Sequence, residues 1–406
     1  MAEGLSDRDA LITGIGLISS LGEGLDDHRA ALGDAGGFQP NIDSASFAPF
    51  TVHPMAAVDY NGQIPKRQDQ RQMEPWQRIG TYAAGVALES AGLKGNADLL
   101  GRTHMIVAAG GGERDYAVDE AILSGLSSAP DPAVFLNEHL MADLRPTLFL
   151  AQLSNLLAGN ISIVHGVVGS SRTFMGEEAA GADAVRIACA RIGAGQGELF
   201  LVGGAYNAQR QDILLQYEMG GLLRKKPFAG VWSRQPDGGG MVMGSLGCFL
   251  VIESRAHAAA RGAAAHARIA AIATDRCRRA PGQATANAAA QWAALAPKMT
   301  PGHAAILSGA SGAAAATAEE AAFLQTTGLP VRGIAGALGH SMEPSFIATI
   351  ALAADCVAQR RLFAPLDITE TPMGGELRQA VVTSWGHWRG EAMALVTGAA
   401  PATGTE

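Results

Sequence analysis

Short apolar runs alternate along the chain with longer stretches in which apolar residues recur at helical spacing. The short runs, bounded by glycine or polar residues, are typical of buried strands, and the periodic stretches are typical of helices packed on a sheet. The pattern predicts strands at residues 10–18, 104–109, 161–164, 199–202, 241–252, 267–273, 303–307, 331–334, 380–384 and 392–396. It predicts helices at residues 24–32, 74–93, 176–192, 255–261, 313–325 and 345–359. Residues 34–68 are rich in turn formers and predict an irregular excursion.

The alternation of strands and helices predicts an α/β protein with a mostly parallel sheet that helices cover on both faces. The scheme runs through the chain twice, more faintly the second time. A length of 406 residues is too great for one simple core and suits two fused halves. We expect an N-terminal half at residues 1–255 and a C-terminal half at residues 256–406.

Composition narrows the class of protein. Apolar residues make up 48% of the chain, which favours a close-packed α/β protein, and the net charge of −8 argues against a nucleic-acid partner. The four cysteines are scattered and show no metal-ligand spacing or disulfide framework. No apolar run is long enough for membrane insertion, so we expect a cytoplasmic protein.

Residues 155–205 carry the most informative motif. They read NLLAGNISIVHGVVGSSRTFMGEEAAGADAVRIACARIGAGQGELFLVGGA and resemble, without a gap, the β-ketoacyl-acyl-carrier-protein synthase II family. Residues 11–22, 66–93, 144–156 and 237–261 extend the resemblance over nearly the whole chain. The resemblance implies the thiolase fold, a five-layered αβαβα architecture of two similar halves, and a dimer. It implies no cofactor.

The resemblance places the family's catalytic groups on this sequence one by one. The nucleophilic cysteine falls on Glu178, the first histidine on Ser308 and the lysine on Ala335, so all three are substituted. The second histidine is retained as His340. The C-terminal loop that gates the pocket falls on Gly386, His387, Trp388 and Arg389.

Glu178 is poorly suited to replace a thiolate. Its attack on a thioester would give a high-energy anhydride, and carboxylate nucleophiles suit glycosyl and phosphoryl transfer better. Two structural interpretations stay open: an acid that caps the helix N-terminus, or a polar plug in a vestigial pocket. His165, His340 and His387 show no metal-ligand spacing, so we expect no metal site.

These substitutions predict a non-catalytic, chain-length-factor-type subunit that pairs with an active ketosynthase in fatty-acid or polyketide synthesis, including aryl polyenes and very-long-chain acyl groups. Leu148, Phe149, Leu150 and Leu153 are the expected interface and tunnel residues. An acyl carrier protein is the other expected partner, and the basic run 224–226 is a candidate docking site, although such runs are more often ordinary surface. Two alternatives are a residual malonyl- or acyl-thioester decarboxylase or acyltransferase, and a homodimeric protein that binds acyl chains or carrier protein.

Overall fold

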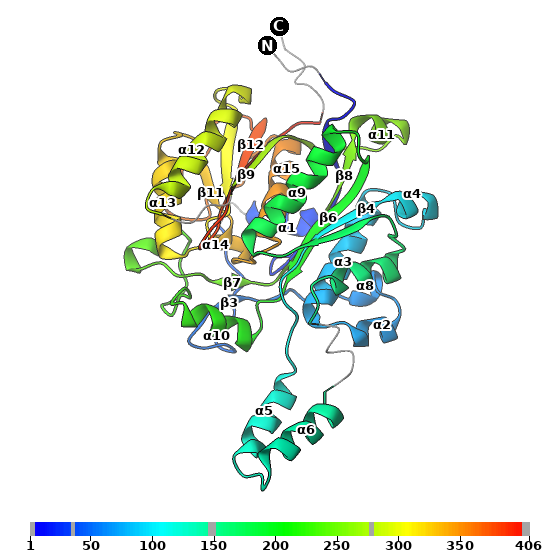
Figure 1. Ribbon diagram of the computed structural model, residues 1–406. Helices are drawn as coiled ribbons and strands as arrows, with labels where there is room; N and C mark the ends of the chain where they lie inside the picture. The colour runs from blue at the N-terminus through cyan, green and yellow to red at the C-terminus, as the bar shows by residue number, and fades with distance from the viewer. Residues whose placement is uncertain (1–4, 34–36, 145–151, 276–279, 400–406) are drawn as a thin grey trace.

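The computed structural model describes residues 5–33, 37–144, 152–275 and 280–399 (Figure 1). Its strands are β1 (Ala10–Ser19), β2 (Gly22–Glu23), β3 (Val52–His53), β4 (His104–Ala108), β5 (Ser171–Phe174), β6 (Leu199–Tyr206), β7 (Met243–Gly244), β8 (Leu246–Ser254), β9 (Ala267–Asp275), β10 (Ala304–Ser308), β11 (Val331–Gly333), β12 (Gln379–Trp385) and β13 (Glu391–Thr397). The helices of the first half are α1 (Gly24–Leu32), α2 (Arg67–Gln72), α3 (Pro75–Ser90), α4 (Ala97–Arg102), α5 (Tyr116–Leu126), α6 (Pro132–Ala142), α8 (Leu156–His165), α9 (Glu178–Gly193) and α10 (Gln211–Met219). The later helices are α11 (Arg255–Ala260), α12 (Gln283–Leu295), α13 (Ala314–Gln325), α14 (Ala335–Leu338) and α15 (Ser345–Ala358).

The main sheet has the strand order β11-β10-β12-β13-β9-β1-β8-β6-β4-β5. Outward from β9 the strand pairs are antiparallel, antiparallel, parallel and parallel, and outward from β1 the same sequence of pairings recurs. The two runs meet where β1 pairs with β9. The expectation of a mostly parallel sheet is wrong, because the strands that return along the centre of the sheet run antiparallel to their neighbours. The boundary at residue 255 remains a prediction.

Helices α9 and α15 pack on each other and on strands of both runs, so they form the central helical layer (Figure 1). Helix α3 covers β1, β8 and β6 on one outer face, while α12 and α13 cover β12 and β13 on the other. The central helix α9 carries buried small residues, including Ala180, Gly181 and Ala184, and these let the layers approach closely. The starts of both central helices therefore lie deep between the two halves, which is where the candidate site is built.

The predicted strand at residues 161–164 is wrong, because this segment belongs to α8. Its β-branched residues favour a strand in isolation. The buried residues Leu157, Ala158 and Ile161 nevertheless fall on one face of a helix that packs on α3 and ends at Gly166, whose left-handed φ of 76° closes it.

Helices α5 and α6 were not predicted, and they form a hairpin that projects from the body of the molecule (Figure 1). Asp131 and Pro132 at the start of α6 are a recognisable helix-start signal, with the Asp131 carboxylate accepting from the Ala133 and Val134 N–H groups. No helix among the described residues is long and apolar enough to cross a membrane.

Candidate functional site

The candidate site begins at the turn between β5 and α9. Gly176 has a φ of 131° and Glu177 a φ of 58° with ψ of −138°, a conformation that a residue with a side chain seldom adopts. The turn sets Glu178 as the first residue of α9, with its side chain pointing between the halves. Strain of this kind persists where the surrounding structure holds it, and it is concentrated at functional sites.

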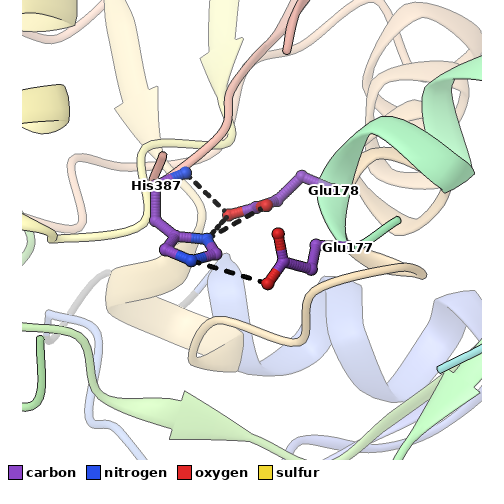
Figure 2. Close-up of side chains that lie close together, drawn as sticks. All are labelled: Glu177, Glu178 and His387. Carbon is purple, nitrogen blue, oxygen red and sulfur yellow. Dashed lines mark hydrogen bonds and ion pairs between the residues drawn. The ribbon is translucent and has the colours of Figure 1, made fainter. Parts of the chain in front are cut away.

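The Glu178 carboxylate is buried and fully engaged (Figure 2). Its Oε1 lies 2.9 Å from His340 Nε2, 2.9 Å from the backbone N of His387 and 2.9 Å from His387 Nδ1. Its Oε2 lies 3.2 Å from the same Nδ1. His340 is 1% exposed, so the three side chains form one enclosed group, the Glu178 cluster.

Electrostatics favour an ionised Glu178. Burial opposes the charge, but the hydrogen bonds and charges of His340 and His387 outweigh it and hold the pKa of Glu178 well below its ordinary value. The capping interpretation does not describe these bonds, because the helix N-cap Glu177 makes no side-chain cap and the recorded partners of Glu178 belong to the two histidines. The carboxylate therefore ties α9 to two loops of the C-terminal half.

A second carboxylate lies beside the cluster. Glu177 Oε1 is 3.7 Å from His387 Nε2, and one oxygen or nitrogen each of Glu177, Glu178 and His387 lie within 4.8 Å of one another (Figure 2). His387 directs Nδ1 at Glu178 and Nε2 at Glu177. The absence of a metal site stays a prediction.

Glu343 is a site residue that the sequence analysis missed. It is 5% exposed, and burial together with the charges of Glu178 and Glu177 raises its pKa to about 7. With Glu177, Tyr206 and Tyr217 it lines a cavity of about 380 Å³. The sequence did offer a signal for this residue, because Glu343 lies two positions before the apolar helix α15. Charged residues are seldom buried without a partner, so its place in an apolar segment indicates a functional or structural role.

The other predicted residues are not members of the Glu178 cluster. Ser308 Oγ donates to Glu320 Oε1 at 2.7 Å, and Ala335 is buried against Val231. In the gate loop, Gly386 N donates to Gly390 O at 2.9 Å, which closes the turn between β12 and β13 and presents His387 to Glu178. Trp388 is 58% exposed with Arg389 against its ring, so it does not fill the site.

The predicted interface residues are only partly visible. Leu153 is 49% exposed, as an interface residue would be in a single chain. Leu148, Phe149 and Leu150 lie outside the described residues. Their roles stay predictions.

The arrangement can hold charge and share protons, but it lacks an activated nucleophile. A carboxylate bonded to three N–H groups is stabilised as it stands and has little tendency to attack a thioester. His340 and His387 are acid–base groups at the site, and each has a ring nitrogen hydrogen-bonded to Glu178.

A model of the β-ketoacyl synthase N-terminal domain matches residues 51–258, about half of the chain. The chain belongs to the β-ketoacyl synthase family. It is 23% identical over 273 residues to 3-oxoacyl-[acyl-carrier-protein] synthase 2 of Vibrio cholerae, a match that covers 65% of this chain and 62% of that protein. The corresponding protein of Rhizobium meliloti is 25% identical over 212 residues, which cover 50% of this chain and 46% of that relative. The matched region thus spans less than two thirds of these relatives.

Solved structures show the same fold over nearly the whole chain. The ishigamide ketosynthase/chain length factor has a TM-score of 0.76 at 20% identity, covering 97% of this chain and 100% of that one. A β-ketoacyl synthase from Burkholderia phymatum has a TM-score of 0.74 at 18% identity, with 97% and 100% covered. The predicted thiolase fold is confirmed, and so is membership of the β-ketoacyl synthase II-like family.

Proposed function

We propose that this chain is a non-catalytic, chain-length-factor-type subunit that pairs with an active β-ketoacyl synthase. The observation that carries the proposal is the engagement of Glu178. The residue at the nucleophile position is a buried carboxylate bound at 2.9 Å by His340 and His387, and the histidine and lysine positions hold Ser308 and Ala335. In this proposal the partner performs the condensation, and this chain forms part of the tunnel for the growing acyl chain.

Exposed apolar groups support a pairing surface. Helices α5 and α6 expose Leu123 at 73% and Met141 at 78%, and their hairpin projects from the body (Figure 1). Ile163 at 74% and Met175 at 62% lie on either side of β5 along the chain. Exposed apolar side chains of this size are candidates for contact with another chain.

Strand β5 adds a backbone template to this surface. It is the last strand at its end of the described sheet and pairs with β4 alone. An unpaired edge invites a strand from another chain. Obligate interfaces typically bury about 2,000–5,000 Å² in total, so the proposal expects a contact of that size in the heterodimer.

Acyl carrier protein is the second proposed partner, and the basic run supports it weakly. Arg224 is buried, with its Nε donating to Pro227 O at 2.7 Å, so it is structural. Lys225 and Lys226 are exposed but lie near Glu218 and Asp237. The chain is also similar in fold to a solved type II polyketide synthase acyl-carrier protein in complex with its ketosynthase, at a TM-score of 0.69 and 14% identity.

The test is co-expression with a ketosynthase that keeps its cysteine and both histidines, followed by solution mass and product analysis. We expect a heterodimer, ketoacyl product from the pair and none from this chain alone. Each transition-state group typically contributes about 10²-fold or more, so Glu178→Cys alone should not restore turnover. Substitution of Phe149 should shift product length without changing acylation of the partner. Turnover by the isolated chain near that of a normal synthase would refute the proposal.

A residual decarboxylase is the second candidate, and one observation favours it. His340 and His387 both stand at the site, where they could assist loss of carbon dioxide from a malonyl thioester. To separate the two candidates, the pure chain is incubated with malonyl-carrier protein. Formation of the decarboxylation product, acetyl-carrier protein, is then measured by mass spectrometry. His340→Ala should abolish any such activity, whereas the pairing function should survive it. A homodimer that binds carrier protein without a ketosynthase partner would support the third alternative.

A further inference from the structure

A short segment of the N-terminal half lies across the C-terminal half beside the candidate site. Residues 230–234, here called the strap, follow the basic run and precede the short 3-10 turn Gln235–Asp237. Val231 is 1% exposed and shares an apolar cluster with Ala310 and Ala335. Ala335 is the family's lysine position, so the strap covers a place where catalytic groups are expected.

The fit of the strap on the C-terminal half is close. A Cβ on Gly333 would lie 2.2 Å from Cγ1 of Val231, and a Cβ on Gly312 would lie 2.2 Å from Nη2 of Arg234. Gly333 thus leaves room for Val231, and Gly312 leaves room for the end of the Arg234 side chain. Ala335 and His340 also line a neighbouring cavity of only about 10 Å³, so little space is left on this side of the cluster.

Two acids of the C-terminal half fasten the strap. Asp367 Oδ2 accepts from the N–H groups of Trp232 and Ser233 at 3.2 and 2.9 Å, and its Oδ1 accepts from Ser233 Oγ at 2.5 Å. Glu370 Oε1 accepts from Trp232 Nε1 at 3.0 Å and from the N–H of Gly333 at 2.6 Å. The strap is therefore tied to β11 and to the loop after α15 by side-chain acceptors, not by sheet bonds.

Arg234 completes the closure. Its side chain is fully buried, and Nη2 donates to Ser311 O at 3.3 Å. A buried guanidinium is costly unless the surrounding structure holds it. Arg234 lies against the 308–312 loop through this one bond, and its Nε and Nη1 have no hydrogen-bond partner among the described residues.

We propose that the strap is a built-in closure that keeps a thioester-bearing arm from reaching the Glu178 cluster past Ala310 and Ala335. The inference rests on the proposed function and deepens it. The chain would be barred from condensation by the loss of the nucleophile, and the approach on the side of Ala310 and Ala335 would be closed as well. Restoring catalytic side chains would then fail unless the strap is also released.

The test uses an introduced thiol under the strap. Ala310→Cys changes a fully buried residue only slightly, and peptide-resolved mass spectrometry follows its alkylation by iodoacetamide. We expect slow labelling in the intact chain. Adding Asp367→Ala removes the three bonds from Trp232 and Ser233 and should raise the labelling rate at least about tenfold. Glu376→Ala is the matched control, because this acid of the same half pairs with Arg360 and Arg378 and should leave the rate unchanged.

A second reporter tests the arm itself. The chloroacetamide of pantetheine is added to the Glu178→Cys variant, whose introduced thiolate displaces chloride and forms a thioether. We expect this reaction to be slow in the single variant and faster when Asp367→Ala is added. Cys248, which is fully buried in the core, reports global unfolding in the same digest. If Asp367→Ala does not fold, Ser233→Ala and amide exchange at residues 231–234 replace it.

Fast labelling of the thiol at position 310 with the strap intact overturns the closure. So does an unchanged rate in Asp367→Ala when amide exchange shows that residues 231–234 have loosened. Neither result touches the proposed function, whose failure would be seen as condensation by the isolated chain or absence of a heterodimer.

Discussion

The two sides of the candidate site differ in how their side chains are held. On one side the site keeps three ionisable side chains, and the ring nitrogens of His340 and His387 each lie 2.9 Å from Oε1 of Glu178. On the other side Ala310 and Ala335 carry no polar side chain and are packed under Val231. The polar side chains are held by hydrogen bonds to one carboxylate, whereas the apolar side chains are held by close packing.

The difference predicts different sensitivities. The polar side depends on a few directional bonds and on charge, so it should respond to isosteric substitutions and to pH. The apolar side depends on volume, so it should respond to changes in size and be insensitive to pH. Three measurements test this contrast and a fourth tests the pairing surface, in order from the largest expected effect to the smallest.

Removing the central carboxylate should have the largest effect. Glu178→Ala leaves the donors of His340 and His387 buried without their acceptor, so we expect the free energy of unfolding to fall by about 3 kcal/mol. Glu178→Gln keeps one oxygen acceptor and should cost about half as much. Urea denaturation at pH 7 measures both, with Glu376→Ala as a control that should show no change. Equal, small losses for both variants would show that the cluster is not held by these bonds.

Glu343 should make stability depend on pH with an unusual sign. Its pKa of about 7 in the folded chain lies above the unfolded value of 4.5, so the unfolded state ionises first as pH rises. The residue therefore destabilises the fold progressively between about pH 4.5 and pH 7 and not below pH 4.5. Glu343→Gln should stabilise the chain by about 2 kcal/mol at pH 8 and have no effect near pH 4. A gain that persists unchanged at pH 4 would contradict this.

Shortening the apolar contact should cost less. Val231→Ala removes two buried methyl groups over Ala310 and Ala335, and we expect a loss of about 1–2 kcal/mol in the free energy of unfolding. The loss should be equal at pH 5 and pH 8, because no titrating group is changed. A strong pH dependence of this loss would erase the contrast between the two sides.

The projecting hairpin should show the smallest effect on the isolated chain. Met141→Ser replaces a side chain that is 78% exposed and should change the free energy of unfolding by less than about 0.5 kcal/mol. The same substitution should weaken the heterodimer, measured as the dissociation constant with the co-expressed ketosynthase. Leu5→Ser, at an exposed site on the N-terminal segment, is the matched control for pairing.

Much of the fold was accessible from patterning. The strands β1, β4, β6, β10 and β12 and the helices α3, α9 and α15 were predicted near their observed places, because each is long or strongly apolar and buried. Helix α8 was not predicted, because the segment 161–164 within it favours a strand by composition. Packing on α3 makes this segment helical. The antiparallel centre of the sheet could not be predicted either, because strand direction depends on which distant strands become neighbours.

The sequence by itself determined the family, the absence of cysteine at position 178 and the retention of His340, because these are read from residues in a fixed frame. Only the tertiary structure decided what Glu178 does. His340 and His387 lie 162 and 209 residues away along the chain, and no local pattern reports a contact over that separation. The same holds for the strap and for Glu343, whose pKa arises from burial beside two other carboxylates. Local propensity sets elements, but the layers of the fold set which polar groups share a site and what each of them can do there.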